Sequence, residues 1–158
     1  MSRYDREAAL RYAQQWALSR NPNFLNFDRM GGDCTNFVSQ CIYAGCREMN
    51  YTPAQGWYYT SGYKRSPSWA GVEFLYQFLI KNRTQGPRAM EVDKQQVRPG
   101  DLTQLGHANG TFYHSQLIVQ VTPEEIYIAA HSYDCWMRPL SSYTYDRGRF
   151  LRVIGSEE

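Results

Sequence analysis

The chain lacks the features that mark membrane-spanning, nucleic-acid-binding and exported proteins. It has no stretch of about 18 apolar residues, so no membrane span is predicted. Its 17 Lys and Arg residues nearly balance 15 Asp and Glu residues, and no basic run gathers, which argues against a nucleic-acid partner. The opening MSRYDREAAL is polar and has no apolar segment typical of a signal peptide. The sequence as given therefore predicts a cytoplasmic protein, with a secreted or phage-associated role as the alternative.

Cysteine is scarce, and its spacing excludes two common uses. The four cysteines are Cys34, Cys41, Cys46 and Cys135. They form none of the paired C-x-x-C hooks of common zinc sites. Nothing indicates the oxidising compartment that a disulfide framework needs. The sequence therefore predicts no metal site, and it gives no sign of a cofactor.

Aromatic side chains are what the chain has in excess. They make up 15% of its 158 residues, with 13 Tyr and 4 Trp. Such a surplus suits a groove that grips polar polymers such as peptides or glycans, and tyrosines at the rim of a small core explain it equally well. The length is enough to bury a core and predicts one domain, residues 1–158.

The pattern of apolar residues changes halfway along the chain. Helical periodicity predicts helices over residues 4–19, 33–44 and 69–81. Gly45 is expected to end the second helix and Ser68 to cap the third. Period-two patterns and apolar runs then predict strands within residues 97–105, 114–121, 125–132 and 149–155, the middle two forming a hairpin. Residues 49–67 and 82–96 are predicted loops. Helices followed by antiparallel strands indicate an α+β fold.

The stretch GGDCTNFVSQC, residues 31–41, places Cys34 at a predicted helix start behind two glycines. A helix N-terminus favours an anion, and the thiolate is the nucleophilic form of cysteine. Asp33 is expected to cap the helix, although its negative charge would raise the pKa of the thiol. The glycines allow close approach of a substrate carbonyl, and the N–H of Cys34 lies where an oxyanion could be held. An inert buried cysteine is the alternative reading of Cys34, and it is the expected reading of Cys41, Cys46 and Cys135.

A cysteine nucleophile needs a general base, and the chain offers His107, His114 and His131. His114 begins the first strand of the predicted hairpin, His131 ends the second, and His107 lies in a loop. If Val121 pairs with Ile126, or if the turn is two residues shorter, His114 and His131 share one face of the sheet. A one-residue slip would separate them. Hydrogen-bonded surface histidines are the alternative, but the pair together with the cysteine favours an enzyme.

Taken together, these segments resemble the "Putative amidase domain" family of the NlpC-like, papain-related cysteine peptidase superfamily. The resemblance rests on GGDCTNFVSQC, AGC, the later tryptophans, RPGD, HSQLIV and AAHS, and it covers nearly the whole chain. It implies a papain-like α+β core, in which the catalytic cysteine starts a helix packed on an antiparallel sheet. It further implies Cys34 as nucleophile, His114 as general base and His131 as the third, orienting group.

One departure from the papain pattern concerns the second oxyanion donor. Papain-type enzymes place a Gln upstream of the cysteine, and no Gln occurs in the region around residues 26–28. Asn23 or Asn26 could supply the donor instead, and Asn36, inside the helix, is a weaker candidate. The choice among them stays open at this point.

The function that follows is amide-bond hydrolysis by an amidase or peptidase through a thioester acyl-enzyme. The expected partner is a peptide or peptidoglycan-like amide substrate, since members of the family are generally inferred to cleave amide bonds. The alternatives are an acyltransferase, transglutaminase-like in its chemistry, on the same triad, or a peptide- or glycan-binding module without turnover. The candidates for a substrate groove are aromatic and lie in or beside the long loop: Trp57, Tyr58, Tyr59, Tyr63 and Trp69. Packing of that loop onto the core is the alternative for each.

Overall fold

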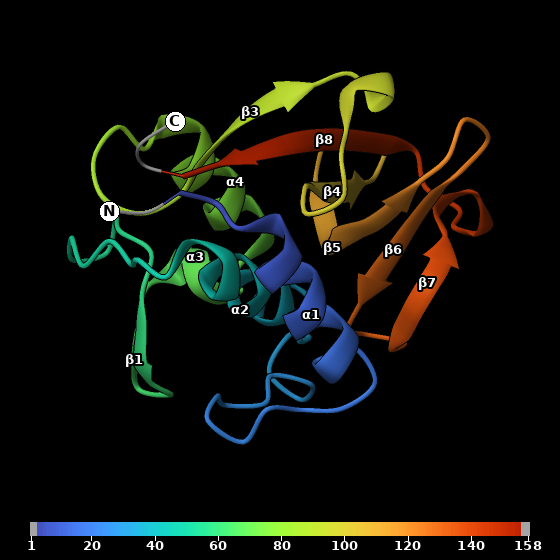
Figure 1. The fold of residues 1–158 in the computed structure, drawn as a ribbon. Coiled ribbons are helices and arrows are strands. Elements are labelled where there is room, and N and C mark those ends of the chain that lie inside the picture. The colour runs from blue at the N-terminus through green and yellow to red at the C-terminus, as the bar shows by residue number, and fades with distance from the viewer. Residues whose placement is uncertain (1–2, 156–158) are drawn as a thin grey trace.

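The computed structural model describes residues 3–155 and has an α+β architecture (Figure 1). The helices are α1 (Arg6–Trp16), α2 (Cys34–Cys46), α3 (Pro67–Ala70) and α4 (Val72–Lys81). A small hairpin, β1 (Tyr59–Ser61) and β2 (Lys64–Arg65), lies between α2 and α3. None of the helices in this range is long and apolar enough to cross a membrane.

The second half of the chain forms a six-stranded antiparallel sheet in the order β3-β8-β4-β5-β6-β7. Its strands are β3 (Arg88–Val92), β4 (Leu102–Gly106), β5 (Phe112–Val121), β6 (Ile126–Ala130), β7 (Cys135–Pro139) and β8 (Arg147–Ile154). Two short 3-10 helices, η1 (Lys94–Gln96) and η2 (Leu140–Ser142), connect them. The longest strand, β5, lies inside the sheet between β4 and β6, where it can be covered on both faces.

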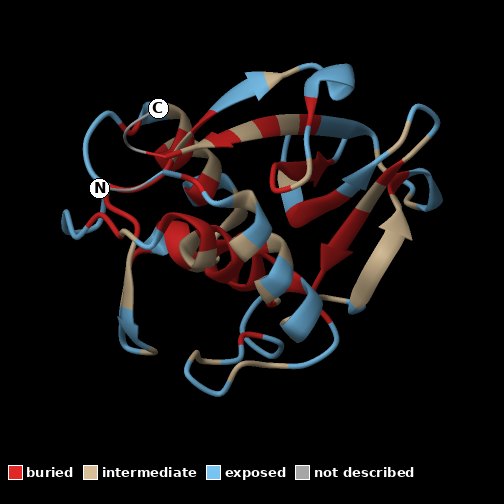
Figure 2. Cartoon of the chain, in the orientation of Figure 1, coloured by how far each residue is buried: buried red, intermediate tan, exposed pale blue. Residues whose placement is uncertain are grey.

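Two hydrophobic clusters cover the two faces of the sheet, and Figure 2 shows the buried residues concentrated in α2 and the inner strands. The larger cluster joins the helices to one face, with Phe37 and Ile42 of α2 packed among Leu102 and Leu117. The smaller cluster lies on the other face, where it includes Ile118. Because Leu117 and Ile118 are neighbours in β5, the strand buries alternate side chains in different cores.

Two predicted helix ends are wrong for local reasons. The predicted third helix is broken at Gly71, whose extended backbone separates α3 from α4, and Ser68 lies inside α3 rather than at a cap. Helix α2 runs through Gly45 and ends at Cys46, and the next residue, Arg47, takes a left-handed conformation with a φ of 58°. Gly45 is needed for space, since an added Cβ would lie 2.6 Å from a ring carbon of Tyr4.

The sequence patterns miss the outer strands of the sheet. β3 lies in a segment predicted as a linker, and β7 follows the last residue of the predicted hairpin. Both are edge strands, and all five residues of β7 are half-buried, so neither shows the alternation of a strand with one buried face. Edge strands of this kind are fixed by pairing with a neighbour rather than by their own pattern.

Candidate functional site

Cys34 begins α2, as predicted, and its thiol lies where the helix meets β5. Its Sγ is 3.8 Å from Oγ1 of Thr35, and a backbone hydrogen bond from Ser115 favours the thiolate. Oγ1 of Thr35 lies 2.9 Å from Oγ of Ser115, which ties the first turn of the helix to the strand. The thiol is therefore held beside the residue that directly follows His114.

The surroundings of Cys34 keep its resting form protonated. Burial is the largest influence and raises the pKa of the Cys34 thiol. Hydrogen bonds from Ser115 and Thr35 lower the pKa, and the charge of Asp33 raises it further. Because burial dominates, the resting group is a thiol and needs a base at the moment of attack.

His114 is a buried histidine whose Nε2 has no hydrogen-bond partner among the described residues. Burial, with a smaller contribution from the charge of Arg138, lowers the pKa of His114 to about 4. The ring is therefore neutral near neutral pH and able to accept a proton. His114 lies on the face of β5 that is covered by the smaller cluster. It is paired with Leu105 of β4, and its ring centroid lies 6.0 Å from that of Tyr143.

His131 does not orient His114, contrary to the prediction. Its Nδ1 lies 2.5 Å from Oδ2 of Asp33, and its Nε2 lies 2.8 Å from the carbonyl oxygen of Trp16. Both ring nitrogens thus have other partners. The His131 ring stacks on Phe37 of α2 at 4.2 Å between centroids. Its contacts place His131 on the helix side of the sheet.

A β-bulge at Val119 is the reason why His131 and His114 lie on different faces of the sheet. The register between β5 and β6 runs Val121 opposite Ile126 and Gln120 opposite Tyr127, then Ile118 opposite Ile128 and Leu117 opposite Ala129. The extra residue in β5 slips the pairing by one position. Continued beyond the strand end, the shifted register brings His131 level with Ser115. The predicted same-face pair of histidines is therefore wrong.

Asp33 stands directly before α2, but its side chain makes no capping hydrogen bond to the helix. Its Oδ1 instead accepts hydrogen bonds from the backbone N–H of Phe27 and from Nδ2 of Asn36. Its Oδ2 faces His131 and lies 3.5 Å from Nε of Arg20. The predicted capping role is wrong because the carboxylate accepts hydrogen bonds from the Phe27 backbone and the Asn36 side chain, and from no backbone N–H of the first turn of α2.

The candidate oxyanion donors differ in how free they are. Asn36 is fully engaged, since its amide also donates to the carbonyl of Leu25 and accepts from Nε1 of Trp69. Asn26 is exposed, and its Oδ1 accepts the backbone N–H of Asp28. Asn23 is also exposed, on the same loop. The structure thus removes Asn36 from the set and brings neither of the others into a described contact with Cys34.

The aromatic residues predicted to wall a groove mostly serve the core. Trp57 and Trp69 are completely buried, and their Nε1 atoms donate to Ser39 and Asn36 of α2. Tyr58 and Tyr59 are partly buried and pack against the larger cluster. Only Tyr63, at the β1–β2 turn, is fully exposed. The prediction of a groove wall is wrong for the two tryptophans.

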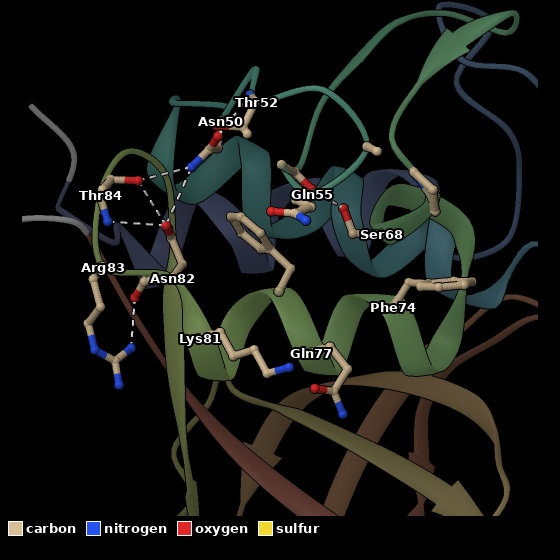
Figure 3. A pocket seen from close by; sticks show the side chains of 14 residues that line it. Asn50, Thr52, Gln55, Ser68, Phe74, Gln77, Lys81, Asn82, Arg83 and Thr84 are labelled. Atoms are coloured by element: carbon tan, nitrogen blue, oxygen red, sulfur yellow. Dashed lines mark hydrogen bonds between the residues drawn. The ribbon is translucent and has the colours of Figure 1, made fainter.

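A cavity of about 720 Å³ lies away from the cysteine (Figure 3). In the close view, Phe74, Gln77 and Lys81 of α4 lie across from Gln55 and Ser68 of the preceding segments. None of the residues that line it belongs to α2 or β5. It is therefore a separate feature from the site around Cys34.

A buried polar chain behind the first turn of α2 was not found from the sequence. Oγ of Ser115 accepts a hydrogen bond from Gln104, whose Oε1 accepts two from Arg149, and Arg149 pairs with Glu73 at 2.9 Å. Thr35 is the first residue of this series of hydrogen bonds, through its contact with Ser115. The only available signal was polar residues at positions of β4 and β5 that the strand pattern places inside. These hydrogen bonds fix the position of α2 on the sheet.

Fold and site together define an α+β domain with a cysteine at a helix start against an antiparallel sheet. The chain belongs to the family described as "Putative amidase domain", whose family model matches residues 3–154. "Uncharacterized protein YhbB" of Bacillus subtilis (strain 168) is 32% identical over 141 residues, covering 85% of this chain and 43% of that protein. "Uncharacterized protein YjcM" of the same organism is 23% identical over 137 residues, covering 82% of this chain and 31% of that protein. The chain thus spans less than half of either relative, and no solved structure gives a significant match.

Proposed function

We propose that the chain hydrolyses an amide bond by nucleophilic attack of Cys34, with His114 as the general base. The observation that carries the proposal is the position of the Cys34 thiol at a helix start, against the backbone of Ser115. The preceding residue, His114, is a buried neutral histidine with an unpartnered Nε2. Membership of a family described as an amidase domain supports the same class of reaction.

The reaction begins from a neutral thiol and a neutral imidazole. As Sγ of Cys34 attacks the substrate carbonyl carbon, Nε2 of His114 takes the thiol proton. The backbone N–H groups of the first turn of α2 hold the oxygen that becomes negative. When the carbon–nitrogen bond breaks, His114 returns the proton to the leaving amine. A water molecule then attacks the thioester while His114 takes its proton, and the acid product leaves with the thiol restored.

The Cys34 thiol and the His114 imidazole are not in contact in the structure, so proton transfer between them requires a movement. Ser115 faces α2, so strand alternation turns His114 toward the other face of the sheet. No hydrogen bond joins Cys34 to His114 among the contacts of residues 3–155. Proton transfer therefore requires the start of β5 to rearrange on substrate binding so that Nε2 of His114 reaches the sulfur, since catalytic hydrogen bonds are often long before substrate binds.

The proposal extends to the papain-related, NlpC-like class of enzyme and to a peptide or peptidoglycan-like substrate. The cysteine at a helix start, the helix packed on an antiparallel sheet and the histidine on a strand support the class. The chain spans under half of each relative, so the substrate of any larger protein that carries this domain is part of the proposal too.

The test is turnover of purified peptidoglycan and of a peptide library, with the fragments identified by mass spectrometry. The wild type is expected to release an amine and an acid from one bond type, and Cys34→Ala to release none. Cys135→Ala, which removes a half-buried thiol outside the site, serves as the matched control and is expected to keep full turnover. Product formation by Cys34→Ala would overturn the proposal.

A further inference from the structure

The hydrogen bonds of His131 fix how many protons it shares with Asp33. The carbonyl oxygen of Trp16 can only accept, so Nε2 of His131 carries a proton. The 2.5 Å approach of Nδ1 to Oδ2 of Asp33 requires a second proton between those two atoms. The pair therefore holds two protons and carries no net charge. Both side chains are almost wholly buried, with 2% and 1% of their surface exposed.

The groups around the pair favour this state. Arg20 contacts Asp33 at 3.5 Å and also pairs with Asp28 and Asp134 at 3.0 and 2.8 Å. Three carboxylates therefore face one guanidinium, and a protonated His131 supplies a second positive charge. The Phe37 ring stacked on the imidazole and the Trp16 carbonyl at its far nitrogen complete its surroundings.

The charge of the His131–Asp33 pair affects how easily Cys34 forms a thiolate, because Asp33 is the residue before Cys34. Asp33 directly precedes Cys34, and its negative charge disfavours a thiolate there. We propose that His131 is a positioning residue that neutralises Asp33 and fixes it, so that the carboxylate beside Cys34 opposes formation of the thiolate less than an unpaired carboxylate would. The proposal rests on the proposed function in taking Cys34 as the reactive thiol. It assigns to His131 a role that acts through Asp33 and not through His114.

The experiment measures the rate of Cys34 alkylation by iodoacetamide as a function of pH, read by mass spectrometry of the Cys34 peptide. Cys135 in the same molecule is the internal reference. In His131→Ala the uncompensated carboxylate is expected to move the midpoint of the profile to higher pH and to slow labelling below it by about tenfold, as a unit charge at short range would. His131→Asn, whose Nδ2 takes the place of Nδ1, can donate to Asp33 but carries no charge, so its midpoint is expected to stay displaced in the same direction, by less than in His131→Ala.

Charge and packing are separated by two further variants. The double variant Asp33→Asn/His131→Ala removes the uncompensated charge, so its midpoint is expected at or below that of the wild type. Ile128→Val loosens the neighbouring strand β6 without touching the pair, and its midpoint is expected to stay in place. An unchanged midpoint in His131→Ala, an equal shift in Ile128→Val, or no recovery in the double variant would each overturn the proposal. Turnover by Cys34→Ala would overturn the proposed function. The alkylation midpoints of the His131 variants test the His131 proposal independently of turnover.

Discussion

Thr35 Oγ1 and Ser115 Oγ lie 2.9 Å apart, on the face of β5 that meets α2. It joins the first turn of the helix that carries Cys34 to the strand that carries His114. Strand alternation then directs His114 away from the helix, so the thiol meets the backbone of Ser115 before it meets the imidazole.

Ser115→Ala is expected to destabilise the fold by about 1–3 kcal/mol. The change leaves the Thr35 hydroxyl and the Gln104 amide, both buried, without the partner they share. Thermal and urea unfolding of the two proteins measure the difference. Ser141→Ala, which removes an exposed hydroxyl bonded to Glu125, is the control and is expected to change the free energy of unfolding by no more than about 0.5 kcal/mol. Equal effects in both variants would contradict this view of Ser115.

His114 is expected to make the fold less stable as the pH falls from about 6.5 to about 4. Burial lowers the pKa of His114 from 6.5 to about 4, so in this window the unfolded chain binds a proton that the folded chain does not. The free energy of unfolding therefore rises with pH across the window, and the full difference is about 3 kcal/mol. Urea unfolding at several pH values measures it.

The carboxylates of the chain also titrate near the lower end of that window, so the informative quantity is the difference between variants. His114→Asn is expected to flatten the slope between pH 6.5 and 4 relative to the wild type. A wild-type slope that persists in His114→Asn would show that this histidine is not buried in its neutral form.

The two glycines before Asp33 permit a matched pair of substitutions. Gly31 and Gly32 have φ values of +98 and +104, so alanine is strained at either position by roughly 1 kcal/mol or more. At Gly32 the new Cβ would also lie 3.3 Å from Oγ of Ser132, whereas nothing lies within 4 Å at Gly31. Gly32→Ala is therefore expected to lower the melting temperature more than Gly31→Ala does. A lower melting temperature for Gly31→Ala than for Gly32→Ala in calorimetry would contradict the close contact between residue 32 and Ser132.

The sequence predicted the features that depend on local chemistry. The start of α2 at Cys34 follows from glycines and an aspartate before a helical apolar stripe, and the hairpin of β5 and β6 follows from two β-rich runs around a short turn. What it missed depends on tertiary contacts. The bulge at Val119, which separates His114 from His131, is invisible to an apolar pattern because one extra residue leaves both strands equally apolar.

The tryptophans were misplaced for a related reason. A long loop rich in aromatic residues has the same composition whether it lines a groove or covers a core. Trp57 and Trp69 are buried because their indole N–H groups find Ser39 and Asn36 on α2, partners that no spacing along the chain reveals. The opposite holds for Tyr63, whose neighbours in a hairpin turn leave it exposed.

Trp69→Phe is expected to destabilise the fold by about 1–3 kcal/mol, because the buried carbonyl oxygen of the Asn36 side chain loses its donor. Tyr63→Ala is expected to change the free energy of unfolding by less than about 0.5 kcal/mol, since its side chain is fully exposed. Unfolding in urea measures both. If Tyr63 helps to bind substrate in the proposed reaction, Tyr63→Ala raises KM at unchanged kcat, a split that a residue of the core would not give.

The thiols are expected to react with iodoacetamide in an order set by burial and hydrogen bonding. Burial raises the pKa of Cys34, but hydrogen bonds from Ser115 and Thr35 oppose it, whereas burial raises the pKa of Cys46 to about 12 and that of Cys41 well above its ordinary value. Cys34 is therefore expected to label slowly at neutral pH, to accelerate as the pH rises, and at every pH to label before Cys46 and Cys41. Quantitative mass spectrometry of the labelled peptides follows each thiol separately. Ser115→Ala keeps the backbone N–H and should preserve the order, whereas labelling of Cys41 ahead of Cys34 in the folded protein would mean that the start of α2 gives its thiol no advantage.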